Sequence, residues 1–84
     1  MFKKEKKYKC TMKVKRQWQI YKAHAALTGL YIENNNHERA KQAAIDAEIQ
    51  RCKFWEVVYE LYPGLKNNVR LIYKEIENYV RVND

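Results

Sequence analysis

Apolar residues recur at helical spacing in three segments of this chain, and this periodicity constrains the fold more than any other feature. Within each segment they follow one another at steps of three and four residues, which places them on one helix face. The three stripes, which polar Thr28 and charged Arg51 interrupt, are Val14, Trp18, Tyr21, Ala25, Thr28 and Ile32; then Ala40, Ala44, Ala47, Arg51, Phe54, Val58 and Leu61; then Leu65, Val69, Ile72, Ile76 and Tyr79. The sequence therefore predicts helices over residues 13–33, 36–62 and 65–82.

Two short interruptions separate the predicted helices. The run Asn34–Asn36 ends the first stripe, and Asn35 followed by Glu38 resembles a capping box at the start of the second helix. Pro63 and Gly64 end the second helix. Because short loops make consecutive helices antiparallel, we expect Trp18 to pack near Phe54. The predicted fold class is all-α, either a small three-helix bundle or a long helical hairpin with a third helix.

The N-terminal residues follow a different pattern. Apolar Tyr8, Cys10, Met12 and Val14 alternate with polar residues, which is the period of a strand with one apolar face. A lone strand needs a partner strand, and here it would come from another subunit or a target. The alternative is an irregular basic arm that merges into the first helix. We therefore divide the chain into a basic arm, residues 1–12, and a helical domain, residues 13–84.

The positive charge of the chain is concentrated at its N-terminus. Residues 1–22 hold nine of the seventeen Lys and Arg residues and one acid, so 9 − 1 gives +8, whereas the whole chain carries +7. Such a concentrated field attracts polyanions, and nucleic-acid affinity depends mainly on neutralising phosphates. A solvated, partly disordered tail is the alternative reading of the same residues.

We therefore predict a small basic nucleic-acid-binding protein of accessory or regulatory type. Lysine outnumbers arginine eight to one in this segment, which favours backbone contacts and low sequence specificity. Interleaved aromatic residues slightly favour RNA or single strands. A weaker alternative is a helix-turn-helix at Pro63, with Lys66 and Arg70 on its recognition helix. The candidate nucleic-acid-binding residues are Lys3, Lys4, Lys6, Lys7, Tyr8, Lys9, Lys13, Lys15, Arg16 and Lys22.

The second predicted helix carries a second apolar row, which three helices leave little room to bury. The row consists of Ile45, Ile49, Cys52 and Tyr59. We interpret it as a dimer or partner interface, and a C₂ homodimer is the commonest solution. The alternative function uses the same row: a phage-type accessory protein that regulates or inhibits a partner enzyme through this apolar helical surface.

Other classes of function find little support in the sequence. Catalytic motifs are missing, so we do not expect an enzyme, and His24 and His37 have no metal-ligand neighbours at suitable spacing. We therefore expect no cofactor and no metal. We also expect no membrane span, because the longest uncharged stretch is far below the ~20 residues that cross a bilayer. Cys10 and Cys52 are not in a C-x-x-C pattern, so we expect reduced thiols and a cytoplasmic location.

Overall fold

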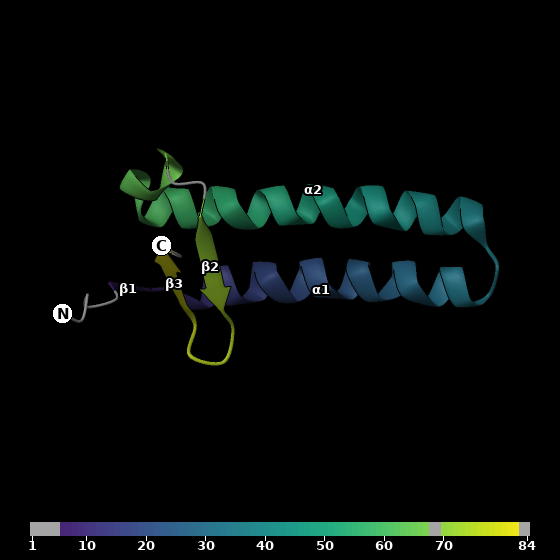
Figure 1. The fold of residues 1–84 in the computed structure, drawn as a ribbon, viewed down its shortest axis with the longest axis horizontal. Helices are drawn as coiled ribbons and strands as arrows, with labels where there is room; N and C mark the ends of the chain where they lie inside the picture. Colours follow the sequence, from purple (N-terminus) through teal and green to yellow (C-terminus); the bar gives the residue numbers. More distant parts are fainter. Residues whose placement is uncertain (1–5, 68–69, 83–84) are drawn as a thin grey trace.

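The protein consists of two long helices and a small antiparallel sheet. The computed structural model describes residues 6–67 and 70–82. The elements run in the order β1 (Lys7–Lys9), α1 (Met12–Glu33), α2 (His37–Leu61), a 3₁₀ helix η1 (Pro63–Asn67), β2 (Leu71–Lys74) and β3 (Tyr79–Val82). The molecule measures 51 × 27 × 23 Å and is elongated along the two helices (Figure 1). Neither helix of the described residues is long and apolar enough to span a membrane.

Helices α1 and α2 form the antiparallel hairpin that the sequence predicts. The ring centroids of Trp18 and Phe54 lie 5.0 Å apart, as expected from the antiparallel arrangement. The cap of α2 is Asn36, one residue later than predicted: its side chain accepts a hydrogen bond of 3.3 Å from the backbone N–H of Arg39. Asn35 instead takes the left-handed conformation, with φ of 55°, in the turn between the helices.

The prediction of a third helix is wrong, and so is the all-α fold class. Residues 71–82 form a β-hairpin in which β2 and β3 pair antiparallel, so the fold is α+β. Ile76, which the helical stripe would bury, is 95% exposed in the turn of this hairpin. Asn78 closes the turn in the left-handed conformation, with φ of 51°. The helix-turn-helix alternative fails for the same reason, because no recognition helix follows η1 in the described residues.

The N-terminal strand finds its partner within the chain rather than in another subunit. Strand β1 pairs antiparallel with β3, and the sheet order is β1-β3-β2. Two side chains fix the strand at its end: the Tyr62 hydroxyl donates to the Lys9 carbonyl at 2.6 Å, and the Asn78 amide donates to the Cys10 carbonyl at 3.0 Å. Residues 7–9 are therefore ordered by residues more than 50 positions away.

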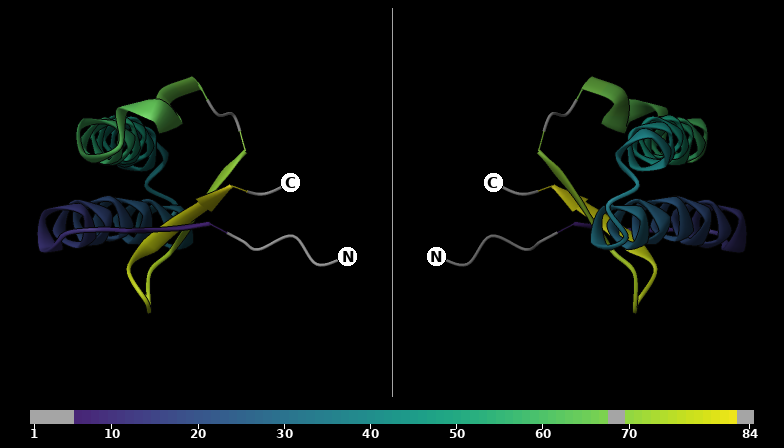
Figure 2. Two further views of the ribbon diagram at one scale, coloured as in Figure 1. Left: turned by 90° about the vertical axis from the view of Figure 1, so that its left-hand side faces the viewer. Right: turned by 90° about the vertical axis from the view of Figure 1, so that its right-hand side faces the viewer.

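The sheet packs across one side of the hairpin, as the end-on views show (Figure 2), and it lies at a single end of the molecule (Figure 1). The core lies between these two layers and is made of Val14, Phe54, Val58, Leu65 and Val80. Further along the hairpin the buried residues of α2 are only Ala40, Ala43 and Ala47. The fold thus combines a well-packed end that positions the sheet with a slender helical end.

Candidate nucleic-acid interface

The two faces of the sheet have different surroundings. Tyr8, Val80 and Tyr73 are opposite one another on the three strands, and they face the helices. The Tyr8 ring lies 5.1 Å from that of Tyr62, the Tyr73 ring lies 4.9 Å from that of Phe54, and Val80 is fully buried. Because side chains alternate along a strand, the neighbouring rows point away from the helices.

The outward rows carry most of the charge of the sheet. One row runs Lys9, Tyr79, Lys74 across the three strands, and the next runs Lys7, Arg81, Ile72. We call the surface formed by these six residues the sheet face. The three lysines are exposed and Arg81 is half-buried. Four cations thus surround one aromatic side chain, an arrangement typical of surfaces that contact phosphates and bases.

Tyr79 lies at the centre of the sheet face, mostly covered by its neighbours. The Lys7 ammonium lies 4.8 Å from the centre of the Tyr79 ring, and Tyr79 is only 9% exposed. Lys7 also lies 3.6 Å from the Glu77 carboxylate, an exposed and therefore weak ion pair. Beside the ring, Tyr79, Lys74 and the turn between β2 and β3 line a shallow depression of about 500 Å³. The flexible Lys7 side chain therefore lies over the ring.

The remaining predicted cations are divided between paired and unpaired groups. Lys13 pairs with Glu60 at 3.7 Å, and Lys22 pairs with Glu75 at 2.6 Å. Lys15 and Arg16 form no ion pair within residues 6–67 and 70–82, and they are neighbours on α1, so their side chains point in different directions.

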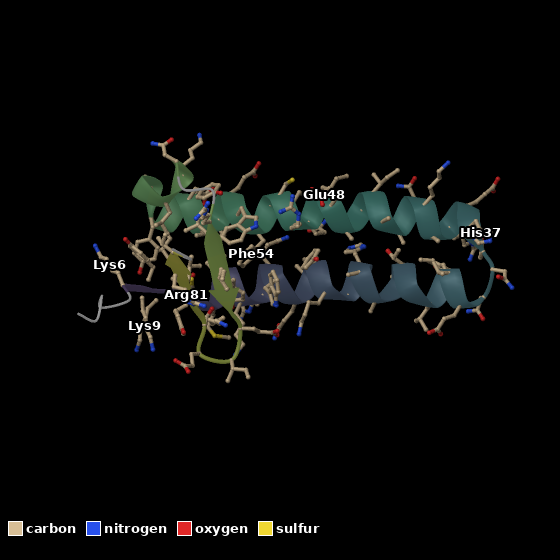
Figure 3. All side chains as sticks on the ribbon, in the orientation of Figure 1. Lys6, Lys9, His37, Glu48, Phe54 and Arg81 are labelled. Atoms are coloured by element: carbon tan, nitrogen blue, oxygen red, sulfur yellow. The ribbon has the colours of Figure 1, made fainter. Side chains whose placement is uncertain are left out.

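The end of the molecule that carries the sheet also holds Lys6 and Lys9 (Figure 3). Figure 3 shows Lys6, Lys9 and Arg81 at that end and His37 at the opposite end. Lys6 Nζ lies 5.2 Å from the centre of the Tyr8 ring. Predicted residues Lys3 and Lys4 lie outside the described residues.

The sequence interpretation missed Tyr79, Lys74 and Arg81, because it placed residues 65–82 on a helix. A signal for strands was nevertheless present: Tyr79 and Arg81 alternate with Val80 and Val82, which is the period of a strand. The register with β1 could not be read from this pattern. Only the structure brings these C-terminal residues beside Lys7 and Lys9.

The second predicted interface lies on α2, away from the sheet face. Ile45 and Ile49 are 52% and 47% exposed, and Cys52 is exposed as well, so these side chains form an apolar surface that indicates an interface. Tyr59 differs from them, because it is half-buried and packs against the core. Its ring stacks on that of Trp55, with 6.2 Å between the ring centroids.

Neither cysteine forms a disulfide. Cys52 is exposed, whereas Cys10 is half-buried, and burial raises the pKa of the Cys10 thiol above its ordinary value. In the part of the chain that the structure describes, no group of three or more His, Cys, Asp or Glu side chains is placed to hold a metal ion.

Comparisons of the chain with protein-family models, with curated proteins and with solved structures gave no match. The geometry of the sheet face and of α2 is therefore the basis on which a function can be proposed.

Proposed function

We propose that this protein binds nucleic acid through its sheet face, with low sequence specificity and a preference for RNA or single strands. The observation that carries the proposal is the row Lys9, Tyr79, Lys74, in which an aromatic ring lies between two exposed lysines on adjacent strands. Neighbouring strands are about 4.8 Å apart, so the backbone positions of Lys9 and Lys74 lie about 10 Å apart on either side of Tyr79, and both flexible side chains can contact phosphates of one extended strand.

The charges of the sheet face support backbone contacts. Lysine is a compact point charge that contacts phosphate without reading base edges, and three of the four cations are lysines. No ion pair within the described residues engages Lys9 or Lys74. Their phosphate contacts would therefore release counterions without first breaking a contact inside the protein.

The covered ring of Tyr79 supports the preference for unpaired bases. An unpaired base that replaces the Lys7 ammonium over the ring gains stacking, worth ~1–3 kcal/mol per base, and frees Lys7 for a phosphate. A duplex keeps its bases stacked inside and offers only its phosphates to the same surface. In this proposal the protein acts by binding and not by catalysis, and it does so in the cytoplasm, where its unpaired thiols stay reduced.

Charge reversal on the sheet face tests the proposal. Binding of a labelled single-stranded RNA is followed by fluorescence anisotropy at low salt, with the wild-type protein and with Lys9→Glu combined with Lys74→Glu. We expect the double variant to weaken binding by about 100-fold or more, because each reversal replaces an attraction by a repulsion.

The matched control reverses two cations of α2, Arg39→Glu with Lys53→Glu, which changes the net charge by the same amount. Both residues are exposed, and neither is part of the sheet face. We expect this variant to keep its affinity within about threefold at moderate salt. Equal losses in the two variants, or no measurable binding by the wild type at ~50 mM salt, would refute the sheet face as the binding site.

A second candidate function is protein binding through α2, and the exposure of Ile45 and Ile49 favours it. A pull-down with nuclease treatment separates the two candidates. A protein complex that survives nuclease and is lost on Ile45→Glu with Ile49→Glu supports the second candidate, whereas recovery that depends on nucleic acid supports the first.

A further inference from the structure

The exposed apolar row of α2 ends in two opposite charges. Lys41, Ile45, Ile49, Cys52 and Glu56 follow one another at steps of four, four, three and four residues, so they share one face of the helix. We call them the α2 stripe. All five are exposed. Lys41 and Glu56 form no ion pair within the described residues, and they are about 22 Å apart along the helix.

The α2 stripe points away from the rest of the molecule. The residues of α2 that pack against α1 and the sheet are Ala40, Ala43, Ala47, Phe54 and Val58. At about 100° per residue, the α2 stripe lies nearly opposite these buried positions. A partner helix can therefore approach the outer edge of the hairpin.

We infer that a second copy of this chain occupies the α2 stripe, with the two α2 helices antiparallel across a two-fold axis. When residue 49 of one copy lies opposite residue 48 of the other, Lys41 lies opposite Glu56 of the second copy, and Ile45 lies opposite Cys52. Each of the two ends then forms an ion pair between copies, and Ile49 meets Ile49 of the second copy at the centre. A parallel arrangement would place Lys41 beside Lys41 and Glu56 beside Glu56, which is repulsive.

The antiparallel arrangement has a consequence for the sheet faces. Two antiparallel helices that lie side by side are related by a two-fold axis perpendicular to the plane that contains both helix axes. Rotation about this axis does not exchange the two sides of that plane, so the same side of each hairpin faces the same way. Since the sheet packs across one side of the hairpin, both sheet faces of the dimer point in the same direction (Figure 2). The dimer itself rests on the α2 stripe and not on the proposed nucleic-acid binding.

Charge exchange along the stripe tests this inference, with self-association measured by sedimentation equilibrium in the absence of nucleic acid. We expect the wild type to approach twice its 10.2 kDa mass as concentration rises. Lys41→Glu should raise the dimer dissociation constant about tenfold or more, and Lys41→Glu with Glu56→Lys should restore it to within about threefold. Residues 41 and 56 are four turns apart on one helix, so only contact between copies explains a rescue.

A cross-linking experiment tests the register, in variants that carry Cys52→Ser. Ile49→Cys should form a disulfide with its copy under oxidation, because the two cysteines are offset by about 1.5 Å along the helices. Ile45→Cys is the matched control, with an offset of about 10 Å, and should not cross-link. Leu27→Glu, at an exposed residue of α1 outside the α2 stripe, should leave the dimer intact.

Four results would overturn the inference. They are a monomer at every concentration, a charge exchange that fails to rescue, cross-linking at residue 45 but not at residue 49, and loss of the dimer on Leu27→Glu. A monomer that nevertheless binds RNA through the sheet face would leave the proposed function standing and assign the α2 stripe to another protein.

Discussion

The indole N–H of Trp18 donates a hydrogen bond of 3.0 Å to the carboxylate of Glu75, which joins α1 to the turn between β2 and β3. The other carboxylate oxygen of Glu75 receives the Lys22 ammonium at 2.6 Å. These hydrogen bonds, first that of Lys22 and then that of Trp18, lower the pKa of Glu75 below its ordinary value of 4.5. Lys22, a residue predicted to contact nucleic acid, is therefore engaged in holding the sheet on the hairpin.

The lowered pKa of Glu75 makes the stability of the protein depend on acid. A carboxylate whose pKa is lower in the folded state stabilises the fold above its unfolded pKa, and this contribution is lost as the pH falls through the folded pKa. We expect the wild type to lose stability as the pH falls below about 4.5, and Glu75→Gln to lose less over the same range. Urea denaturation at a series of pH values measures this difference.

Glu33→Gln serves as the control for the acid dependence. Glu33 is exposed at the end of α1 and has no ion-pair partner in the described residues, so the substitution removes a carboxylate without affecting the sheet. If Glu33→Gln flattened the pH dependence as much as Glu75→Gln, the effect would come from net charge and not from the contact with Trp18.

Asn78 connects the sheet to the start of α1, and replacing it should destabilise the fold. Its amide donates to the carbonyls of Cys10 at 3.0 Å and Thr11 at 3.1 Å, and its oxygen accepts from the Tyr73 hydroxyl at 2.6 Å. Because its φ is 51°, alanine at this position adds strain to the lost hydrogen bonds. We expect Asn78→Ala to cost about 2–4 kcal/mol and Asn78→Gly about 1–3 kcal/mol of unfolding free energy.

Asn35 is a control that distinguishes the stability effect of the Asn78 hydrogen bonds from that of its left-handed backbone conformation. Asn35 has a similar φ of 55° but is exposed in the turn between the helices, and no hydrogen bond of its side chain is present in the described structure. Asn35→Gly should therefore be neutral or stabilising by a few tenths of a kcal/mol. Equal losses at the two positions in thermal denaturation would contradict the role assigned to the Asn78 side chain.

Phe54 is the central residue of the core, and its truncation should be among the most damaging substitutions in the chain. Its side chain is fully buried, and the rings of Trp18, Tyr73 and Trp55 lie 4.9–5.0 Å from it. Phe54→Ala should lower the unfolding free energy by about 3–5 kcal/mol. Ala43→Gly, in the slender part of the hairpin, should cost only about 1 kcal/mol, the difference in helix propensity. Denaturation followed by circular dichroism compares the two, and similar losses would mean that stability is not concentrated at the sheet end.

The sequence predicts the hairpin well because its signals are local. The stripes of α1 and α2 extend over many turns, and a run of asparagines separates them, so the contact between Trp18 and Phe54 follows from helix geometry alone. The C-terminal residues also fit a helical stripe, from Leu65 to Tyr79, but the stripe is short and rich in Val, Ile and Tyr. For such segments the pairing partner decides between helix and strand.

Strands β2 and β3 are partners of each other in a local hairpin, but the second partner of β3 is β1, and no local signal connects these two ends of the chain. The pairing of Tyr8 with Val80 joins residues 72 positions apart, and it depends on a core that only the complete fold creates. The sequence therefore indicated Lys7 and Lys9 as candidate binding residues but could not place Tyr79 and Arg81 beside them. Of the six sheet-face residues, charge alone indicated Lys7 and Lys9, and the other four required the sheet register.

Salt should weaken the proposed nucleic-acid binding to an extent set by the number of cations that contact phosphates. For single strands, each neutralised phosphate contributes about 0.7 to the slope of log affinity against log salt concentration. Because Lys9 and Lys74 form no ion pair within the described residues, Lys9→Gln with Lys74→Gln should make the slope shallower by about 1.4. Lys13 and Lys22 already pair with Glu60 and Glu75, so Lys13→Gln with Lys22→Gln should leave the slope nearly unchanged, although the net charge falls equally. Anisotropy titrations over a series of salt concentrations measure the slopes, and a shallower slope for the second variant alone would assign the phosphate contacts to α1 and not to the sheet face.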